Sequence, residues 1–245
     1  GYGMAGDVLV SFPAPGGRNY KEVLSWLDGV EDFPMGTNRE LRGSGVTPIG
    51  GALNAVRDWL TNDTSPAGPG AGVLNHDAQI ACRSYNVILI TDGIETQMCS
   101  NACGINGQLA ADLLYHACTN GGVYDPIDQR CEKQGSTAGT SEIPVRTYVV
   151  GFTVNDPSLN GIAAAGGTNE AVLANDQAEL TARLGDIIAG SIPVETCDCK
   201  DNTCDGMVDE SFPKKGEACT VGTGRCQRAG VWACSPDGTG LICSS

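Results

Sequence analysis

The sequence predicts an α/β protein, a mostly parallel and doubly wound sheet with helices on both sides, followed by a small disulfide-rich C-terminal module. The first part rests on alternation: between Gly6 and about Ile192, apolar segments of strand length alternate with segments of helical length, as in parallel sheets. The second part rests on composition. After Pro193 the chain is dense in cysteine, glycine and turn residues, and so short a segment needs cross-links because its core is small.

Four segments are predicted to be strands. Residues 86–91, NVILIT, and 145–154, VRTYVVGFTV, are continuous apolar runs, as expected for strands that are covered on both faces. Residues 7–12, DVLVSF, and 171–174, AVLA, are shorter candidates.

Helices are predicted between these strands. Residues 19–27 and 107–118 have helical length and composition, and residues 48–60 place Leu53, Val56 and Leu60 on one face. Pro48 stands in a first turn, where proline is tolerated.

The two C-terminal helices have recognisable ends. Asp156 and Pro157 open one helix, and Gly166 with its neighbour Gly167 stops it. Asp176 and Glu179 form a capping-box-like start for the last helix. Its buried face is expected to consist of Leu180, Leu184, Ile187 and Ile188.

Composition excludes some partners. The chain of 245 residues carries 15 basic and 29 acidic side chains, a formal net charge of −14. Nucleic-acid binding needs a basic footprint, so it is not expected. No apolar run approaches the roughly 20 residues of a membrane helix, and no signal peptide opens the sequence, so we expect any export signal to have been removed or to lie outside it.

The 12 cysteines predict an oxidising, extracellular compartment. Zinc is the alternative, but the two histidines, His76 and His116, lie far from most cysteines, and CDCKDNTC has no second CxxC at zinc spacing. Disulfides are therefore favoured.

The cysteine count also predicts a bond between the two regions. Residues 1–193 hold five cysteines and residues 194–245 hold seven, so at least one disulfide must cross if all pair within the chain. We expect the crossing bond to use Cys197 or Cys199. Residues 98–141 form a cysteine-containing insertion that we expect to be bridged internally. The first-region cysteines are Cys82, Cys99, Cys103, Cys118 and Cys131.

A carboxylate follows the strand NVILIT directly. Ligands of parallel sheets bind beyond the carboxyl ends of the strands, where Asp92 is placed. Thr47 stands at a helix start and is expected on the same rim. Their hard oxygens suit Mg²⁺ or Ca²⁺. The alternative is that Asp92-Gly93 is only a turn and Thr47 only a helix cap.

Four ordered blocks, GVTPIGGAL, VILITDG, RTYVVGF and LNGIAAAGGT, resemble the motifs of von Willebrand factor A domains. The resemblance covers about residues 6–192 and implies a Rossmann-like fold with a metal-ion-dependent adhesion site on the rim of the sheet. It implies that Mg²⁺ or Ca²⁺ is held there by an Asp-x-Ser-x-Ser loop, a Thr and an Asp, and that a partner's carboxylate completes the shell. Thr47 matches the family's Thr, and Asp92 its Asp.

The chain departs from this family at its start. It contains no Asp-x-Ser-x-Ser, and DVLVSF looks like the family's second strand rather than its central first strand. A sheet without that strand would expose unpaired backbone groups. We therefore expect the chain to be a fragment, or another chain to supply the strand. The alternative is a degenerate site in which DVLVSF is itself central.

Residues 201–210, DNTCDGMVDE, follow the spacing of a calcium loop, with Gly206 at its sharp turn. Phe212 stands where such loops usually have Glu, a departure shared with thrombospondin-type repeats. We expect Ca²⁺ here, assisted by a backbone carbonyl near Met207; the alternative is an acidic turn without metal. The candidate ligands are Asp201, Thr203, Asp205 and Asp209.

The tail, about residues 197–244, also resembles the Cys-Asp-Gly-x-Val-Asp-Glu motif and the Cys/Gly-rich repeat of secreted bacterial surface proteins, called MopE-type. Together the resemblances imply an extracellular adhesion module on a bacterial outer surface, with a protein or cell-surface ligand. The alternative is a structural subunit of a surface assembly with a degenerate site. An enzyme is not expected, and a hydrolase is the least favoured reading, because no G-x-S-x-G elbow occurs.

Overall fold

The computed structural model describes Arg18, Lys21 and residues 47–64, 71–96, 105–133, 135, 137 and 139–244. The predicted strand 7–12 lies outside the described residues, as does the predicted helix 19–27 apart from Lys21. The chain divides into two compact units. The first comprises Gly1–Asp77 and Tyr85–Ile187, and the second comprises Ala78–Ser84 and Ile188–Ser245.

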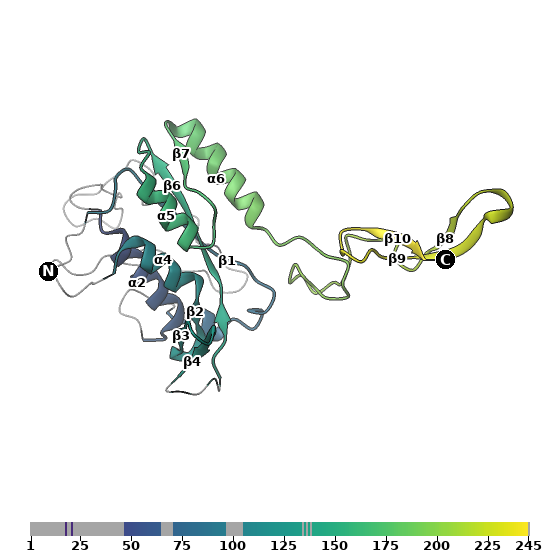
Figure 1. The fold of residues 1–245 in the computed structure, drawn as a ribbon, viewed down its shortest axis with the longest axis horizontal. Coiled ribbons are helices and arrows are strands. Elements are labelled where there is room, and N and C mark those ends of the chain that lie inside the picture. The colour runs from purple at the N-terminus through teal and green to yellow at the C-terminus, as the bar shows by residue number, and fades with distance from the viewer. Residues whose placement is uncertain are drawn as a thin grey trace. The chain divides into compact units, whose positions relative to one another are not determined.

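The first unit contains a parallel sheet of three strands in the order β1-β6-β7 (Figure 1). These strands are β1 (Tyr85–Thr91), β6 (Val145–Phe152) and β7 (Val172–Ala174). β1 and β6 pair in parallel along their lengths, with Tyr85 opposite Val145 and Thr91 opposite Gly151. The prediction of a mixed α/β protein with a parallel sheet is confirmed at this level.

Helices pack on both faces of this sheet. Helix α5 (Pro157–Ala165) lies on the face that carries Thr147 and Gly151, where Leu159 approaches Gly151. Tyr148 and Phe152 point to the other face and pack with helix α6 (Gln177–Ser191) around Val150, Ala174 and Ile187. Strand residues alternate between faces, so the apolar run of β6 serves both layers.

The predicted helix ends are confirmed at α5 and α6. The Asp156 carboxylate accepts a hydrogen bond from the Ser158 amide at 2.9 Å. Asp176 accepts from the Glu179 amide at 2.9 Å, and Glu179 reaches back to the amide of Asn175 at 2.7 Å.

The prediction that Ile188 belongs to the buried face of α6 is wrong, because this residue is 53% exposed. Leu180, Leu184 and Ile187 do pack toward the sheet. A helix repeats every 3.6 residues, so Ile188 lies about 100° around the axis from Ile187 and leaves the contact stripe.

Two further helices begin near the end of β1. Helix α2 (Ile49–Thr61) buries Leu53 and Leu60, and helix α4 (Gly107–Tyr115) buries Leu114. The helix predicted over 107–118 is shorter than expected, because Ala117 and Cys118 form strand β2. A short helix, α3 (Val73–His76), follows α2.

The insertion between α4 and β6 is built from short strands. Strand β2 (Ala117–Cys118) pairs with β5 (Glu142–Ile143), and β3 (Val123–Asp125) pairs with β4 (Arg130–Glu132). A single 3₁₀ turn, η1 (Thr119–Gly121), joins β2 to β3. The Cys118–Cys131 disulfide confirms internal bridging, whereas Cys99 and Cys103 lie outside the described residues.

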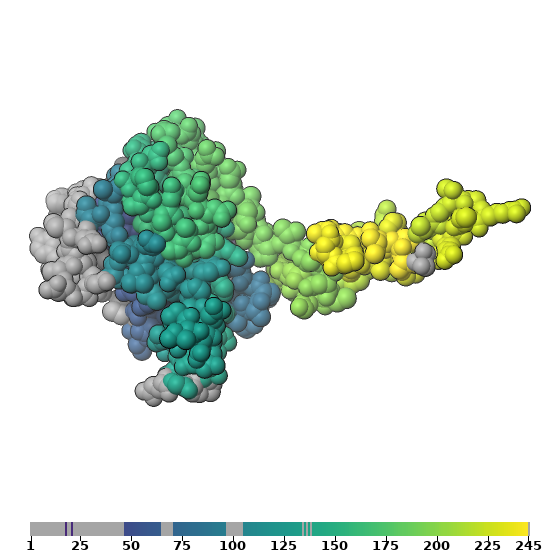
Figure 2. All heavy atoms as spheres, in the orientation of Figure 1, coloured from purple at the N-terminus to yellow at the C-terminus, as the bar shows by residue number. Residues whose placement is uncertain are grey.

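The second unit ends in an antiparallel sheet in the order β10-β9-β8. Its strands are β8 (Ala218–Val221), β9 (Arg228–Cys234) and β10 (Leu241–Ser244), and a 3₁₀ turn, η2 (Gly224–Cys226), lies between the first two. The Cys219–Cys243 disulfide joins its outer strands. Figure 2 shows the β8–β9 hairpin as a narrow projection, and most of its residues are exposed.

A disulfide does join the two sequence regions, but its position corrects the prediction. Cys82 pairs with Cys204, whereas Cys197 pairs with Cys234 and Cys199 is a free, exposed thiol. The segment Ala78–Ser84 belongs to the second unit, which is why Cys82 meets the tail. Cys197 or Cys199 was expected to form the crossing bond because they lie nearest to the first region in the sequence, and this criterion was wrong.

Four disulfides within the described residues are compatible with an extracellular protein. Among these residues, none of the helices has both the length and the apolar character needed to cross a membrane.

Candidate metal-binding sites

The rim at the end of β1 is held by reciprocal hydrogen bonds between two loops. The Thr47 amide donates to Thr96 Oγ1 at 2.8 Å, and the Thr96 amide donates to the Thr47 carbonyl at 3.0 Å. The Thr47 hydroxyl oxygen lies 3.0 Å from where a Cβ on Gly93 would be. Thr47 and the Asp92-Gly93 turn thus share one end of the sheet.

Glu95 explains why a second carboxylate follows this strand. Its two carboxylate oxygens accept hydrogen bonds from the amides of Gly50 and Gly107, each at 2.8 Å. These amides belong to the first turns of α2 and α4, whose N-terminal ends favour negative charge. A Cβ on Gly50 would lie 2.4 Å from the carbonyl oxygen of Ile105, so only glycine permits this approach.

The sequence alone assigns no role to Glu95. Its two amide donors are 45 and 12 residues away in sequence, so no local spacing could identify them. The only sequence signal is an acidic residue that follows a predicted strand after a short turn.

The rim retains two hard oxygen donors. Asp92 is exposed and Thr47 is half-buried, and their oxygens are of the kind that Mg²⁺ and Ca²⁺ prefer. The carboxylate of Glu95 is already occupied by two amides. The residues present therefore fit part of a divalent-metal shell.

The tail loop is wound around Asp201. Its carboxylate accepts from the amides of Asp205 at 3.3 Å and Gly206 at 2.9 Å, and these bonds hold the pKa of Asp201 below its ordinary value. Asp205 accepts from the Met207 amide at 2.8 Å. Gly206 has φ +88°, a left-handed conformation that glycine adopts without strain, as the calcium-loop spacing predicts.

Thr203 gives a second observation in this loop. Its hydroxyl oxygen is buried without a hydrogen-bond partner among the described residues, as is one carboxylate oxygen of Glu210. Buried oxygens are normally satisfied. Asp201, Thr203 and Asp205 therefore fit the first part of a calcium loop, in both backbone conformation and donor chemistry.

Asp209 is engaged differently from the other candidate ligands. Its side chain is 3% exposed and pairs with the ammonium group of Lys215. Its other oxygen accepts from the amides of Asp198 at 2.9 Å and Cys199 at 3.2 Å. The Lys215 hydrogen bond is the main cause that holds the pKa of Asp209 below its ordinary value, and Asp209 raises the pKa of Lys215.

The four predicted tail ligands are not brought to one point. Within the part of the chain that the structure describes, the single cluster of three acidic, thiol or imidazole ligand groups is Cys197, Asp209 and Cys234. Cys197 and Cys234 are bonded to each other, so they supply no thiolate to a metal. Asp201 and Asp205 stand apart from this cluster.

Glu195 is a further buried group that sequence reasoning missed. It is 5% exposed and accepts from the amides of Asp209 at 3.0 Å and Asn202 at 3.2 Å. It thereby ties the beginning of the loop to its end. Its position two residues before Cys197 carried no recognisable signal.

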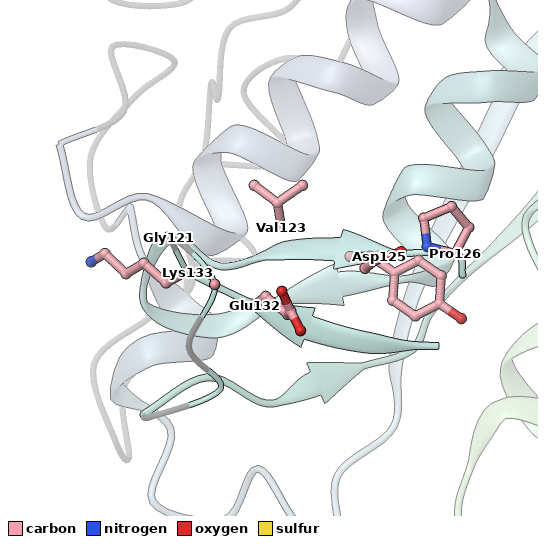
Figure 3. Close-up of a pocket in the computed structure, with 8 residues that line it drawn as sticks. Gly121, Val123, Asp125, Pro126, Glu132 and Lys133 are labelled. Atoms are coloured by element: carbon pink, nitrogen blue, oxygen red, sulfur yellow. The ribbon is translucent and has the colours of Figure 1, made fainter. Parts of the chain in front are cut away.

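The insertion carries a shallow hollow of about 520 Å³ on the β3–β4 hairpin (Figure 3). Beside it, His116 contacts Glu142 at 2.6 Å and stacks on Tyr124 with ring centroids 4.0 Å apart. Ring stacking and a polar contact with a carboxylate therefore account for His116. Residues around the hollow include Val123, Tyr124, Asp125, Pro126, Glu132 and Lys133.

Comparisons with family models, curated proteins and solved structures found no match to this chain.

Proposed function

We propose that the chain is an extracellular binding module of the von Willebrand factor A type, which recognises a protein or cell-surface ligand in a metal-dependent way. The observation that carries the proposal is the placement of the Thr47 hydroxyl beside the Asp92-Gly93 turn, at the end of β1. Ligands of open α/β sheets bind at this edge. The proposal includes a Rossmann-like sheet in which β1 is a central strand.

The metal and the ligand would bind together at this rim. Thr47 and Asp92 would supply two oxygens to Mg²⁺ or Ca²⁺, and a carboxylate of the partner would add another. Two protein oxygens compete poorly with hydration of Mg²⁺, so the ion alone should be held weakly. Ile94, 46% exposed and close to Asp92 in sequence, offers an apolar contact to a protein partner.

The test uses an immobilised glutamate-rich peptide and its glutamine counterpart as probes. We expect the full chain to be retained on the glutamate peptide in Mg²⁺ and released by EDTA, with no retention on the glutamine peptide. Asp92→Asn should abolish retention, whereas Asp58→Asn, on helix α2, should not. Retention that persists in EDTA and in the Asp92→Asn variant would refute metal-dependent recognition.

A structural subunit of a surface assembly is the second candidate. Glu95 favours this candidate, because both of its carboxylate oxygens accept hydrogen bonds from helix amides. Few oxygens then remain at the rim to coordinate a metal. If neither peptide retains the chain under any condition, this candidate becomes the better account.

The proposal also includes a strand supplied by another segment or chain. Within the described residues β1 pairs only with β6, Ile90 is 48% exposed, and the side-chain oxygen of Asn86 is buried without a partner. An apolar parallel strand is normally covered on both faces. β1 amides that point away from β6 should exchange rapidly with solvent until the strand is supplied, and slow exchange in this chain alone would contradict the idea.

For the tail we propose a Ca²⁺ site held by Asp201, Thr203 and Asp205, with Asp209 as a fourth ligand when it is free. Chelation should then increase protease cleavage after Cys197. Asp201→Asn should cleave at the chelated rate whether or not Ca²⁺ is present. Identical cleavage of the wild type with and without a chelator would count against calcium in this loop.

A further inference from the structure

The turn that carries Asp92 is closed by the side chain of Thr91, the last residue of β1. The Thr91 hydroxyl donates a hydrogen bond to the Gly93 carbonyl at 2.8 Å, and its oxygen accepts one from the Gly93 amide at 3.2 Å. Thr91 is 6% exposed, so water competes little for these bonds. One buried hydroxyl therefore holds both backbone groups of the residue that follows Asp92.

The loop after β1 separates the side chains that hold it from those that are exposed. Thr91 is buried and Glu95 is half-buried, and both accept hydrogen bonds from backbone amides. Asp92 and Ile94 are exposed. Asp92 thus stands between two fixed points of the loop. A side chain on a fixed loop binds a ligand at a smaller cost in conformational entropy than one on a loose loop.

Gly93 leaves space beside the Thr47 hydroxyl. A Cβ on Gly93 would lie 3.0 Å from the Thr47 hydroxyl oxygen, closer than an ordinary van der Waals contact. The φ angle of Gly93 lies outside the left-handed region, so its backbone does not require glycine. What glycine supplies at this position is therefore room next to the hydroxyl.

We propose that Thr91 is a positioning residue of the rim. By holding Gly93 it keeps the Asp92-Gly93 turn beside the Thr47 hydroxyl, in the conformation that binds a partner's carboxylate in the presence of Mg²⁺. The inference rests on the proposed function. Thr91 acts through the backbone of the turn and does not contact the partner, so its loss should weaken binding rather than abolish it.

The first experiment needs neither metal nor partner. Thr91→Val keeps the shape of the side chain but removes the hydroxyl, and hydrogen exchange of the Gly93 amide is followed by NMR in the metal-free full chain. We expect this exchange to become several-fold faster in Thr91→Val and to return to the wild-type rate in Thr91→Ser, which keeps the hydroxyl. Equal Gly93 exchange in Thr91→Val and wild type would overturn the proposal.

The second experiment measures affinity for the immobilised glutamate-rich peptide in Mg²⁺. Thr91→Val should weaken binding about tenfold, the scale on which two hydrogen bonds contribute, and Thr91→Ser should bind like wild type. Thr220→Val, at an exposed position of strand β8, is the matched control and should also bind like wild type. Equal affinities of Thr91→Val and Thr220→Val would contradict a positioning role.

Gly93→Ala tests the space beside Thr47 separately. It should weaken peptide binding, because the added methyl group crowds the Thr47 hydroxyl, and it should leave exchange of the amide at position 93 slow. Gly185→Ala is the control, since a Cβ at Gly185 has no atom within 4 Å of it among the described residues. Wild-type affinity of Gly93→Ala would show that this space is not used.

The inference and the proposed function fail in different ways. If wild type is not retained on the glutamate peptide in Mg²⁺, the proposed function is wrong, and the role of Thr91 falls with it. If wild type is retained, Asp92→Asn abolishes retention and Thr91→Val binds as tightly as wild type, only the role of Thr91 is wrong. Should Thr91→Val fail to fold, Thr91→Ala, which also removes the hydroxyl, takes its place in both measurements.

Discussion

At the scale of single residues, Glu95 links three elements. It follows β1 and accepts hydrogen bonds from the first turns of α2 and α4. Glu95→Gln keeps the size of the side chain but leaves one acceptor oxygen. We expect it to lower the free energy of unfolding by about 1–3 kcal/mol, measured from hydrogen exchange of the α2 and α4 amides in urea.

Glu170→Gln is the control for that substitution, because Glu170 is exposed. Equal stabilities of the two variants would mean that Glu95 does not hold the rim together.

Asp156 gives a prediction about pH. Hydrogen bonds from Ser158 hold the pKa of its carboxyl group below the ordinary value of 3.8, since the anion is the better acceptor. A lowered folded-state pKa adds stability above the unfolded-state pKa, and this is lost as pH falls through the folded-state value. Wild type should therefore lose its advantage over Asp156→Asn below about pH 4.

Urea midpoints of wild type and Asp156→Asn at neutral and acidic pH would measure this loss. A difference between the two proteins that stays constant with pH would show that Asp156 does not cap α5 as an anion.

At the scale of elements, the Cys82–Cys204 disulfide fixes the segment Ala78–Ser84 within the second unit. Replacing both cysteines with serine frees a closed loop with a sequence separation of 122. We expect protease cleavage within this segment to rise at least roughly tenfold, because local opening becomes less costly. Peptide mapping after limited proteolysis would measure it.

The matched control replaces Cys219 and Cys243, which bridge the outer strands of the tail sheet. Cleavage within Ala78–Ser84 should then stay at the wild-type rate. If both double variants open this segment equally, the crossing bond has no special role in holding it.

Local patterns were sufficient for the central elements of the first unit. The apolar runs predicted β1 and β6, and capping residues predicted the start of α5 through Asp156. Those signals act within a few residues. The partner of Cys82 and the hydrogen bonds of Glu95 depend on contacts between distant segments, and no local spacing encodes them.

The tail shows the same limit. Spacing indicated the turn at Gly206, and this turn is present. It did not indicate that Asp209 would turn toward Lys215. The spacing identifies possible donor atoms only within residues 201–210, whereas Lys215, the cation that pairs with Asp209, lies outside this segment.

At the scale of the whole molecule, the chain contains two compact units, and each carries its own candidate site. The rim belongs to the first unit and the acidic loop to the second. An ion that both sites can bind would report on each separately, provided that the measurement resolves individual residues.

The most direct test of the central claim is paramagnetic broadening of backbone amide signals by Mn²⁺, which replaces Mg²⁺ or Ca²⁺ at oxygen sites. We predict that Mn²⁺ broadens the amide signals of Gly93 and Ile94 in the full chain. Asp92→Asn should remove this broadening, while signals of the loop around Asp205 should still broaden. Sharp signals for Gly93 and Ile94 throughout the titration, with broadening confined to the tail, would contradict a metal-binding rim.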